Sequence, residues 1–458
     1  MPISIVIDRS AAAPLYQQIA EQIKEQIAAG KLMTGARLPT VRQLADDLGV
    51  TRLTIQSAYG ELQAGGWIEA TVGRGTFVSQ QPRRPLRAAA GTPPTAVHVI
   101  GDILQLSESS GIRSLGKASP DPALFPAEEF WAVLGQLLPH SAELAGYGSA
   151  QGDPALRLAF AENVRERGID ATPADILITA GVTQGLALTA QSLAQPGDTV
   201  LVEQPTYIGF LHQLRSYGLN PIAVPMDDQG VQPEMLERIA IQTRARFLYT
   251  ISTYHNPTGC CAPVERRRQL LEIAHRVGFK IVEDDIYAAL ALDAPPPPAI
   301  KSLDRNGSVV YLSSLSKSFM PGLRIGFLIA PQPLLERLTS LRMATDLVSP
   351  LLLQRTAAEL LKSGCLRRHL RRVIPLYRAR RDALLAALAL HLPNEVTFTQ
   401  PTGGLSCWLT LPRRPGLQDL PRQMVEAGWA VAPGEVLWAD HDGDLHLRLS
   451  YGCCRRIR

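Results

Sequence analysis

Five short segments of the chain carry side chains that can take part in chemistry. Residues 181–185 (GVTQG) lie between an expected strand and an expected helix, where backbone N–H groups at the helix N-terminus can hold a phosphate. Asn256 and Asp284 come at the ends of apolar strands and supply an amide and a carboxylate. Lys317, in a serine-rich stretch, supplies an amine, and Arg448 can pair with a carboxylate through two parallel hydrogen bonds.

Each of these features has an ordinary structural explanation when it is taken alone. Most glycine turns only turn the chain, a carboxylate at the end of a strand is normally a cap, and a lysine in a serine-rich loop is usually solvated. Together they supply what the chemistry of pyridoxal phosphate requires. That chemistry needs a lysine for the imine, an acid at the pyridine nitrogen, a donor at the ring oxygen, a phosphate cup and a group for the substrate carboxylate.

Four more side chains extend this candidate site. Tyr207 follows another expected strand and can stack on a pyridine ring, although alone it would be interpreted as a packed aromatic residue. Tyr287 comes three residues after the candidate acid. Ser314 and Arg324 flank Lys317, and we expect both to bind the phosphate.

A second group of side chains, near the N-terminus, suits DNA. The first turns of a recognition helix contact base edges in the major groove, while other donors hold phosphates. The alternative is a helical bundle used for dimerisation with ordinary solvated arginines, and the equal numbers of basic and acidic residues in residues 1–79 favour neither interpretation. The candidates are Thr51, Arg52, Leu53 and Gln56 in the expected recognition helix, Arg42 at the start of the preceding helix, and Arg74 at the tip of an expected hairpin.

The N-terminal part of the chain, residues 1–79, has the pattern of a winged helix-turn-helix. Apolar residues recur every four positions over residues 15–27, which predicts a first helix. Thr40 begins a capping box before a second helix, and Thr51 can cap a third after a short link. A glycine-turn hairpin expected over residues 67–78 completes the motif.

Two further parts follow. Residues 80–110 contain four prolines and three arginines, which predicts a linker that is either a solvated tether or a contact to DNA phosphates. In residues 111–458, apolar strands alternate with helices, which predicts an α/β fold with a mostly parallel central sheet covered by helices. We expect these strands at residues 175–179, 199–203, 247–252, 280–284 and 309–313.

The composition excludes several classes of protein. The 458 residues are 46% hydrophobic and 19% charged, which is ordinary for globular proteins, and a net charge of +4 does not by itself indicate nucleic-acid binding. The six cysteines show neither a disulfide framework nor CxxC spacing, and the histidines form no HExxH, so we expect no metal site. The first ten residues lack the pattern of a signal peptide, and no apolar stretch approaches the roughly 18 residues of a membrane span. We therefore expect a soluble, cytoplasmic protein.

The N-terminal pattern closely resembles the DNA-binding domain of the GntR family of regulators. The resemblance rests on LYQQI at residues 15–19, GARLPTVRQLA at 35–45, LGVTR at 48–52 and GRGTFV at 73–78. It implies that a DNA operator is the partner and that the DNA-facing positions are Arg42, Thr51, Arg52, Leu53, Gln56 and Gly75.

The C-terminal part closely resembles the fold-type I aminotransferases, through the segments already described and their order. The resemblance implies that Lys317 forms the Schiff base with pyridoxal 5'-phosphate and that Asp284 binds the pyridinium nitrogen. The chain departs from the pattern at Ser119, where glycine is usual, and after Tyr451, where the family continues through another helix. The resemblance also implies Asn256 and Tyr287 at the ring oxygen, Tyr207 stacked on the ring, Val182, Thr183, Ser314 and Arg324 around the phosphate, Arg448 at the carboxylate, and Tyr147 reaching the phosphate of a partner subunit.

The combination of the two parts is the arrangement of the MocR subfamily of bacterial regulators. It implies a transcription regulator that senses pyridoxal phosphate or an amine or amino-acid effector bound to it, working as a homodimer of head-to-tail type. A catalytically active aminotransferase that carries a DNA-binding domain is the alternative, because the set of catalytic residues is complete. A cofactor-binding scaffold without DNA affinity fits the N-terminal motifs less well.

Overall fold

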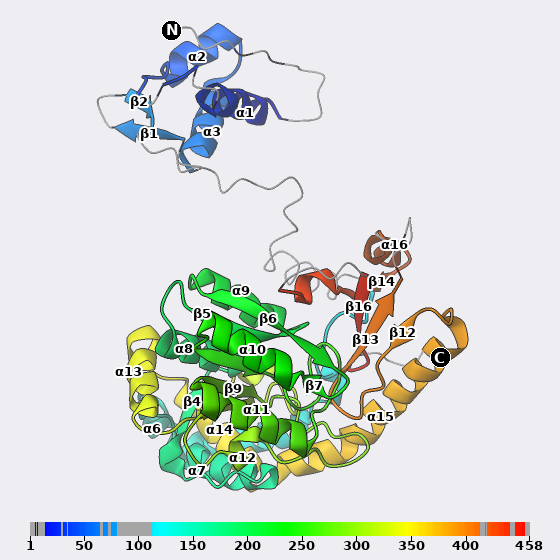
Figure 1. Cartoon of the computed structure of the whole chain (residues 1–458). Helices are drawn as coiled ribbons and strands as arrows, with labels where there is room; N and C mark the ends of the chain where they lie inside the picture. The colour runs from blue at the N-terminus through cyan, green and yellow to red at the C-terminus, as the bar shows by residue number, and fades with distance from the viewer. Residues whose placement is uncertain are drawn as a thin grey trace. The chain divides into compact units, whose positions relative to one another are not determined.

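The computed structural model describes most of the chain. These residues are Ile5, Ile7 and residues 14–28, 31–33, 35–64, 67–71, 75–79, 112–412, 417, 419–439 and 445–453. They belong to two compact units, a first unit within Met1–Pro93 and a second unit within Pro94–Arg458 (Figure 1). The predicted linker lies outside the described residues, so its boundaries stay predictions.

The described residues of the first unit form three helices and a hairpin. Thr40 accepts a hydrogen bond from the backbone of Gln43, whose side chain accepts one from the backbone of Thr40. The second helix ends at Gly49, which has a left-handed backbone with φ 63°. The predicted capping box and helix end are therefore confirmed. The elements are α1 (Leu15–Ala28), α2 (Val41–Leu48), α3 (Arg52–Ala64), β1 (Ile68–Thr71) and β2 (Gly75–Val78).

One apolar core holds these elements together. Ile19 and Ile23, on the predicted face of α1, are fully buried, and they share a core with Leu44 of α2 and Ile55 of α3. The hairpin closes the core, since β1 and β2 are antiparallel and a buried residue of each strand faces it. Because one face of α3 packs in this core, the opposite face of α3 is held toward solvent.

An eight-stranded sheet organises the second unit. Strands β10, β9, β8, β5 and β6 run parallel, whereas β11 is antiparallel to β10 and β4, and β7 is antiparallel to β6. The predicted α/β fold with a mostly parallel sheet is confirmed, although β6, β7 and β11 were not among the predicted strands. In spatial order the strands are β4 (Ile176–Thr179), β11 (Gly326–Ile329), β10 (Val309–Ser314), β9 (Lys280–Asp284), β8 (Phe247–Thr250), β5 (Thr199–Gln204), β6 (Asn220–Asp227) and β7 (Gly230–Val231).

Helices cover both faces of this sheet. Successive side chains of a strand point to opposite faces, so strands that are apolar throughout must be covered on both faces. Val200 and Val202 of β5 pack with α8 and α9, whereas Leu201 between them packs with α10 and α11. Helices α7 and α14 pack on the end of the sheet formed by β4 and β11. The covering helices are α7 (Pro154–Asn163), α8 (Val182–Leu193), α9 (Ile208–Ser216), α10 (Pro233–Thr243), α11 (Val264–Val277), α12 (Ile300–Leu303), α13 (Leu334–Asp346) and α14 (Leu351–Lys362).

A smaller sheet lies in the C-terminal part of the second unit. The long helix α15 (Cys365–His391) leads into it and packs Leu384 and Leu388 against its core. A separate parallel pair joins β3 (Arg113–Ser114) to β14 (Trp429–Ala430). In spatial order the small sheet contains β12 (Thr397–Phe398), β13 (Ser406–Leu411), β16 (Leu445–Ser450) and β15 (Ala432–Pro433), and the remaining α-helices are α5 (Ala127–Gln136), α6 (Ser141–Leu144) and α16 (Leu420–Glu426).

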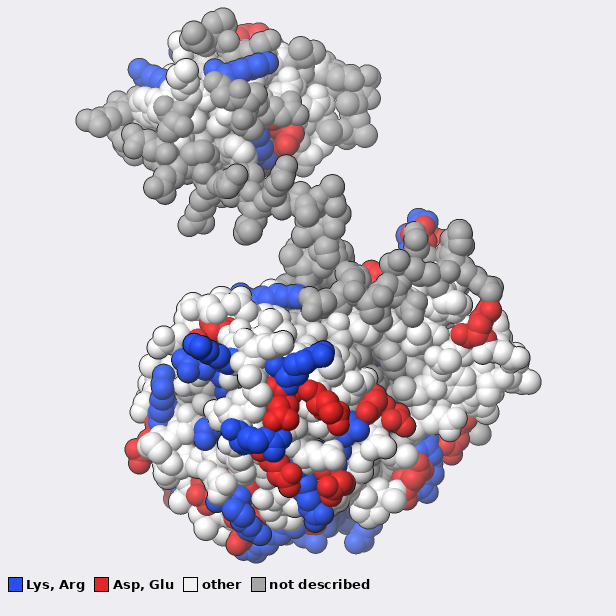
Figure 2. All heavy atoms as spheres, viewed as in Figure 1, with Lys and Arg blue, Asp and Glu red and all other residues white. Residues whose placement is uncertain are grey.

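This topology brings the predicted site segments to one edge of the large sheet. The carboxyl ends of β5, β8, β9 and β10 lie at the same edge, because these strands are parallel. Ligands of open α/β sheets bind at that edge. Lys and Arg side chains are mixed with Asp and Glu over the face of the second unit shown in Figure 2, so charge on that face does not single out a ligand surface. Among the helices that the structure describes, none combines the length and the apolar character needed to cross a membrane.

Candidate functional site

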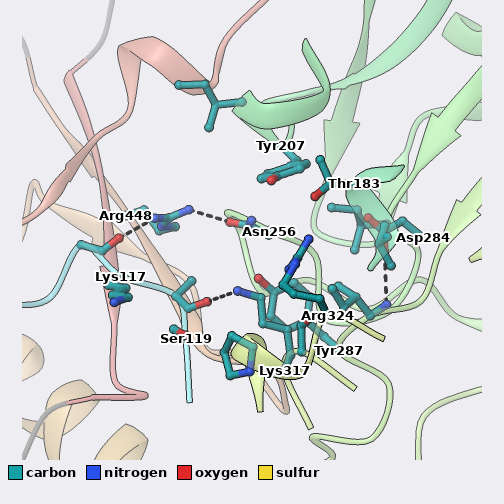
Figure 3. A pocket seen from close by; sticks show the side chains of 18 residues that line it. Lys117, Ser119, Thr183, Tyr207, Asn256, Asp284, Tyr287, Lys317, Arg324 and Arg448 are labelled. Atoms are coloured by element: carbon teal, nitrogen blue, oxygen red, sulfur yellow. Dashed lines mark hydrogen bonds between the residues drawn. The ribbon is translucent and has the colours of Figure 1, made fainter. Parts of the chain in front are cut away.

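A cavity of about 340 Å³ lies at this edge of the large sheet (Figure 3). Both sheets contribute to its wall, together with the segment that follows β3. The structure therefore brings together most of the predicted site, from segments that are far apart in the sequence. The predicted residues that line the cavity are Val182, Thr183, Tyr207, Asn256, Asp284, Tyr287, Lys317, Arg324 and Arg448.

Lys317 presents its amine to the cavity. Its Nζ donates a hydrogen bond to the carbonyl oxygen of Ala118 at 2.6 Å. Burial, assisted by the nearby cation of Arg448, lowers the pKa of Lys317 to about 8. A much larger fraction of this lysine is therefore the neutral, nucleophilic amine near neutral pH than in an ordinary lysine.

Asp284, at the end of β9, places a buried carboxylate in the same cavity. Its Oδ2 accepts a hydrogen bond from the hydroxyl of Tyr249 at 3.0 Å, and its Oδ1 accepts one from the backbone N–H of Ile286 at 3.3 Å. Burial outweighs both bonds and raises the pKa of Asp284 to about 7. A protonated ring nitrogen placed at this carboxylate would hold it ionised.

Arg448, in β16, closes another side of the cavity. Its Nη1 donates to Oδ1 of Asn256 at 3.0 Å and its Nη2 donates to the carbonyl oxygen of Gly116 at 2.5 Å, while its buried Nε has no partner among the described residues. The bond to Oδ1 sets the orientation of the Asn256 amide, so that its NH₂ group is free to donate to a ligand. Strand β16 is paired on both sides, with β13 and β15. The residues that follow it reach Ser119, where the thiol of Cys453 donates a hydrogen bond to the backbone carbonyl oxygen of Ser119.

The turn before α8 forms a cradle with Arg324. Gly181 precedes the helix with φ 89°, and a Cβ at this position would lie 2.9 Å from Nη2 of Arg324. Arg324 itself has φ 53° and donates from Nη2 to the carbonyl oxygen of Ala180 at 2.8 Å. The guanidinium is thereby held beside the N-terminus of a helix, the arrangement that suits a phosphate.

Two predicted cofactor residues do not line the cavity. The hydroxyl of Ser314 accepts a hydrogen bond from the backbone N–H of Ser316 at 3.2 Å, and Ser316 lines the cavity instead. Tyr147 is 77% exposed. Its predicted reach to the phosphate of a partner subunit involves a second chain and stays a prediction.

Several residues of the site were missed by sequence reasoning. Tyr249 lies in β8, and its hydroxyl donates to the carboxylate of Asp284. In the sequence, only the alternation of side chains along this strand indicates that Tyr249 faces the same side of the sheet as Asp284. The segment 116–119 lines the cavity, and its only signal was the SPD motif that starts at Ser119. The other missed lining residues are Ile208, Ile251, Ile286, Ser316 and Pro321.

The first unit presents four of the predicted DNA contacts at the start of α3. Thr51, Arg52, Leu53 and Gln56 are all exposed at the start of α3, and Arg42 is exposed at the start of α2. The 71% exposure of Leu53 is unusual for a leucine next to a buried core, and an apolar side chain there can contact a thymine methyl group. Arg74 lies outside the described residues, and Gly75 has φ 116° with the side chain of Arg37 packed against it.

Comparison with known proteins assigns each unit to a class. The family of bacterial regulatory proteins called gntR matches residues 15–78, and the family of class I and II aminotransferases matches residues 120–455. The multiple substrate aminotransferase of Thermococcus profundus is 33% identical in sequence, with a TM-score of 0.73 over 78% of this chain and 90% of that one. The α-aminoadipate aminotransferase LysN of Thermus thermophilus, complexed with N-(5'-phosphopyridoxyl)-L-leucine, is 34% identical, with a TM-score of 0.71 over 77% of this chain and 89% of that one.

Two relatives match both units together. The uncharacterized HTH-type transcriptional regulator YdfD of Bacillus subtilis is 34% identical over 96% of this chain and 92% of its own. The probable rhizopine catabolism regulatory protein MocR of Rhizobium meliloti is 30% identical over 94% of this chain and 87% of its own. The chain therefore belongs to the MocR subfamily of the GntR family of DNA-binding transcription regulators, whose second unit has the aminotransferase fold.

Proposed function

We propose that this regulator binds pyridoxal 5'-phosphate through a covalent bond to Lys317 and senses the cofactor, or an amine or amino acid bound to it. The observation that carries the proposal is that one cavity is lined by the amine of Lys317, the carboxylate of Asp284, the start of α8 at Val182 and Thr183, and the guanidinium groups of Arg324 and Arg448. These are the groups that such a cofactor and an amino acid require.

The residues present fit the cofactor in three respects. The pKa of the Lys317 amine is lowered by burial, and among the described residues the amine bonds to a carbonyl oxygen and not to a carboxylate. Asp284 is a buried acid whose hydrogen-bond partners are both neutral, which leaves it available to a protonated ring nitrogen. A Cβ at Gly181 would fill the space beside Arg324 that a phosphate would approach.

Each residue then has a definable part in binding. Pyridoxal phosphate, when bound, supplies an aldehyde that reacts with primary amines. Asn256 would donate from its amide NH₂ group to the ring oxygen, because Arg448 already occupies the amide oxygen. An amino-acid effector that takes the place of Lys317 would free that side chain and place its own carboxylate at Arg448, and we infer that this exchange is coupled to DNA binding.

A working aminotransferase is the second candidate function. It is favoured by the convergence of Lys317, Asp284 and Tyr287 in the cavity, since these are the predicted catalytic residues. A screen of amino donors that follows formation of the keto product distinguishes the two functions, because a sensor without turnover yields no product. A gel shift on the DNA upstream of its own gene tests the role in regulation.

Arg52→Ala is expected to weaken binding to operator DNA while the absorption spectrum of the bound cofactor stays unchanged. A side chain in the first turn of a recognition helix contributes about 1–3 kcal/mol when it contacts a base. Arg52 is exposed at the first residue of α3, so its loss does not disturb the core of the first unit. A gel shift with the purified variant measures the effect, and an unchanged operator affinity would show that Arg52 does not contact DNA.

We further propose that the protein acts as a homodimer of head-to-tail type. The proposal is supported by the exposure of Tyr147, which the resemblance assigns to the phosphate site of a partner subunit. Such a dimer is expected to bury about 2,000 Å² or more and so to persist on dilution. Sedimentation velocity at micromolar concentration checks this, and a monomer that retains its cofactor would contradict it.

A further inference from the structure

The cavity has more positive than negative side chains. Among the described charged residues that line it, Lys117, Lys317, Arg324 and Arg448 are basic, and Asp284 alone is acidic. Positive charges gathered in a partly buried space disfavour one another, and here both Arg448 and Lys117 lower the pKa of Lys317. The ligands of this cavity must therefore bring negative charge.

The proposed function assigns a ligand group to every charged residue except one. Lys317 takes the cofactor aldehyde, Arg324 takes the phosphate, Asp284 takes the ring nitrogen and Arg448 takes the effector carboxylate. Lys117 remains. It is half-buried in the cavity wall, and its side-chain ammonium makes no hydrogen bond or ion pair with any described residue.

The backbone that carries Lys117 is held beside Arg448. The carbonyl oxygen of the preceding residue, Gly116, accepts the hydrogen bond from Nη2 of Arg448. A Cβ at Gly116 would lie 3.0 Å from the backbone carbon of Val431, so the segment packs closely on the small sheet. Figure 3 shows Lys117 and Arg448 on the same side of the cavity, across from Asp284. Lys117 is thus placed for the effector and away from the ring nitrogen of the cofactor.

Two cations, Lys117 and Arg448, lie on the side of the cavity where we expect the effector, so an effector with two acidic groups would pair with both. The planar fork of Arg448 suits the α-carboxylate of an amino acid, because the two N–H groups match two carboxylate oxygens. The ammonium of Lys117 is a point charge on a flexible stem, which suits a second acid at a less strictly defined position. Because the cavity of about 340 Å³ holds cofactor and effector together, the effector is small.

We propose that Lys117 makes this regulator selective for small amino acids with an acidic side chain, with the α-carboxylate on Arg448 and the side-chain carboxylate on Lys117. The inference rests on the proposed function, since it places the effector in the cofactor site. It assigns to Lys117 the role of a specificity-determining residue.

The test compares acidic amino acids with their amides, which have nearly the same shape without the side-chain charge. The full-length protein loaded with pyridoxal phosphate is titrated with L-glutamate, L-glutamine, L-aspartate and L-asparagine, and the change in the visible absorption band gives a dissociation constant for each. A charged hydrogen bond predicts a preference of about tenfold or more for one acid over its amide. Lys117→Met is expected to abolish that preference by weakening the acid while leaving the amide unchanged.

Two control variants separate charge from structure. Lys117→Arg keeps the cation and is expected to keep most of the preference. Lys362→Met removes one exposed lysine of α14, which does not line this cavity, and is expected to bind all four ligands as the unchanged protein does.

The outcomes that overturn the inference differ from those that overturn the proposed function. Equal affinity for acid and amide, no spectral response to either, or a Lys117→Met variant that weakens both equally would show that Lys117 does not select the side chain. A protein that develops no lysine-linked absorption band with pyridoxal phosphate would instead overturn the proposed function, and the inference with it.

Discussion

Lys317→Ala is expected to abolish the visible absorption band of the lysine-linked cofactor and the response of DNA binding to any amine effector. The reason is chemical, since we expect the cofactor to bond to Nζ of Lys317, which lies in the cavity at 2.6 Å from the carbonyl oxygen of Ala118. The other lysine that lines the cavity, Lys117, lies beside Arg448, across from Asp284. Treatment with borohydride followed by mass spectrometry gives the second measurement. The unchanged protein is expected to carry a fixed adduct on the peptide that contains Lys317, and the variant none.

The same variant is expected to remain folded and to keep its basal affinity for DNA. Nζ of Lys317 bonds to the carbonyl oxygen of Ala118 and forms no salt bridge with an acidic side chain among the described residues, so the substitution removes no ion pair. Thr51 and Arg52, which we expect to contact DNA, belong to the other unit. Lys362→Ala, at an exposed lysine of α14, is the matched control. A Lys317→Ala protein that still shows the band, or that responds to the amine normally, would mean that another residue links the cofactor.

Short-range patterns account for what could be predicted from the sequence. Thr40 and Gln43 bond to each other across three residues, and Ile19 and Ile23 lie one helical turn apart, so both features were visible without any knowledge of the fold. The site residues were recognisable because Asn256 and Asp284 each follow an apolar strand, and parallel strands bring such positions to one edge. Resemblance then supplied their roles.

Long-range packing accounts for what could not be predicted. Gly116 and Arg448 are 332 positions apart and meet only because β3 pairs with β14 and because β16 lies within the small sheet. The SPD motif that begins two residues later is the only local signal that the segment of Lys117 lines a cavity. Ser314 and Ser316 illustrate a finer limit, because sequence places both beside Lys317 but only the path of the loop decides which one faces the ligand.

A buried network of charges supports the segment that carries Asn256. Arg267 of α11 is fully buried and donates to the carbonyl oxygens of Ala262 and Ser252, both at 2.9 Å, and to the hydroxyl of Thr253 at 3.0 Å. Its Nη1 lies 3.7 Å from Oε1 of the buried Glu283. The loop between β8 and Asn256 therefore depends on a charged side chain outside the cavity.

Arg267→Met is expected to destabilise the second unit by about 3–5 kcal/mol, the cost of removing one partner from a buried ion pair. The substitution leaves Glu283 buried beside Asp285, with Arg167 as the remaining cation that bonds to Asp285. It also removes the hydrogen bonds that the guanidinium donates to the carbonyl oxygens of Ala262 and Ser252, although Ser252 keeps the bond from the backbone N–H of Ala262. Burial and Asp285 already raise the pKa of Glu283, so loss of the guanidinium raises it further. Urea unfolding followed by tryptophan fluorescence measures the change.

The neighbouring residue on α11 provides the matched control. Arg268 is 57% exposed and pairs with Glu265 at 3.4 Å, so Arg268→Met is expected to change stability by about 1 kcal/mol or less. Adding Glu283→Gln to Arg267→Met is expected to recover part of the loss, because the amide carries no charge to be left unpaired. The affinity for pyridoxal phosphate is expected to fall with stability in the single variant, since Ser252 and Thr253 lead directly to Asn256. If Arg267→Met were as mild as Arg268→Met, the buried network would not be what holds Asn256 in place.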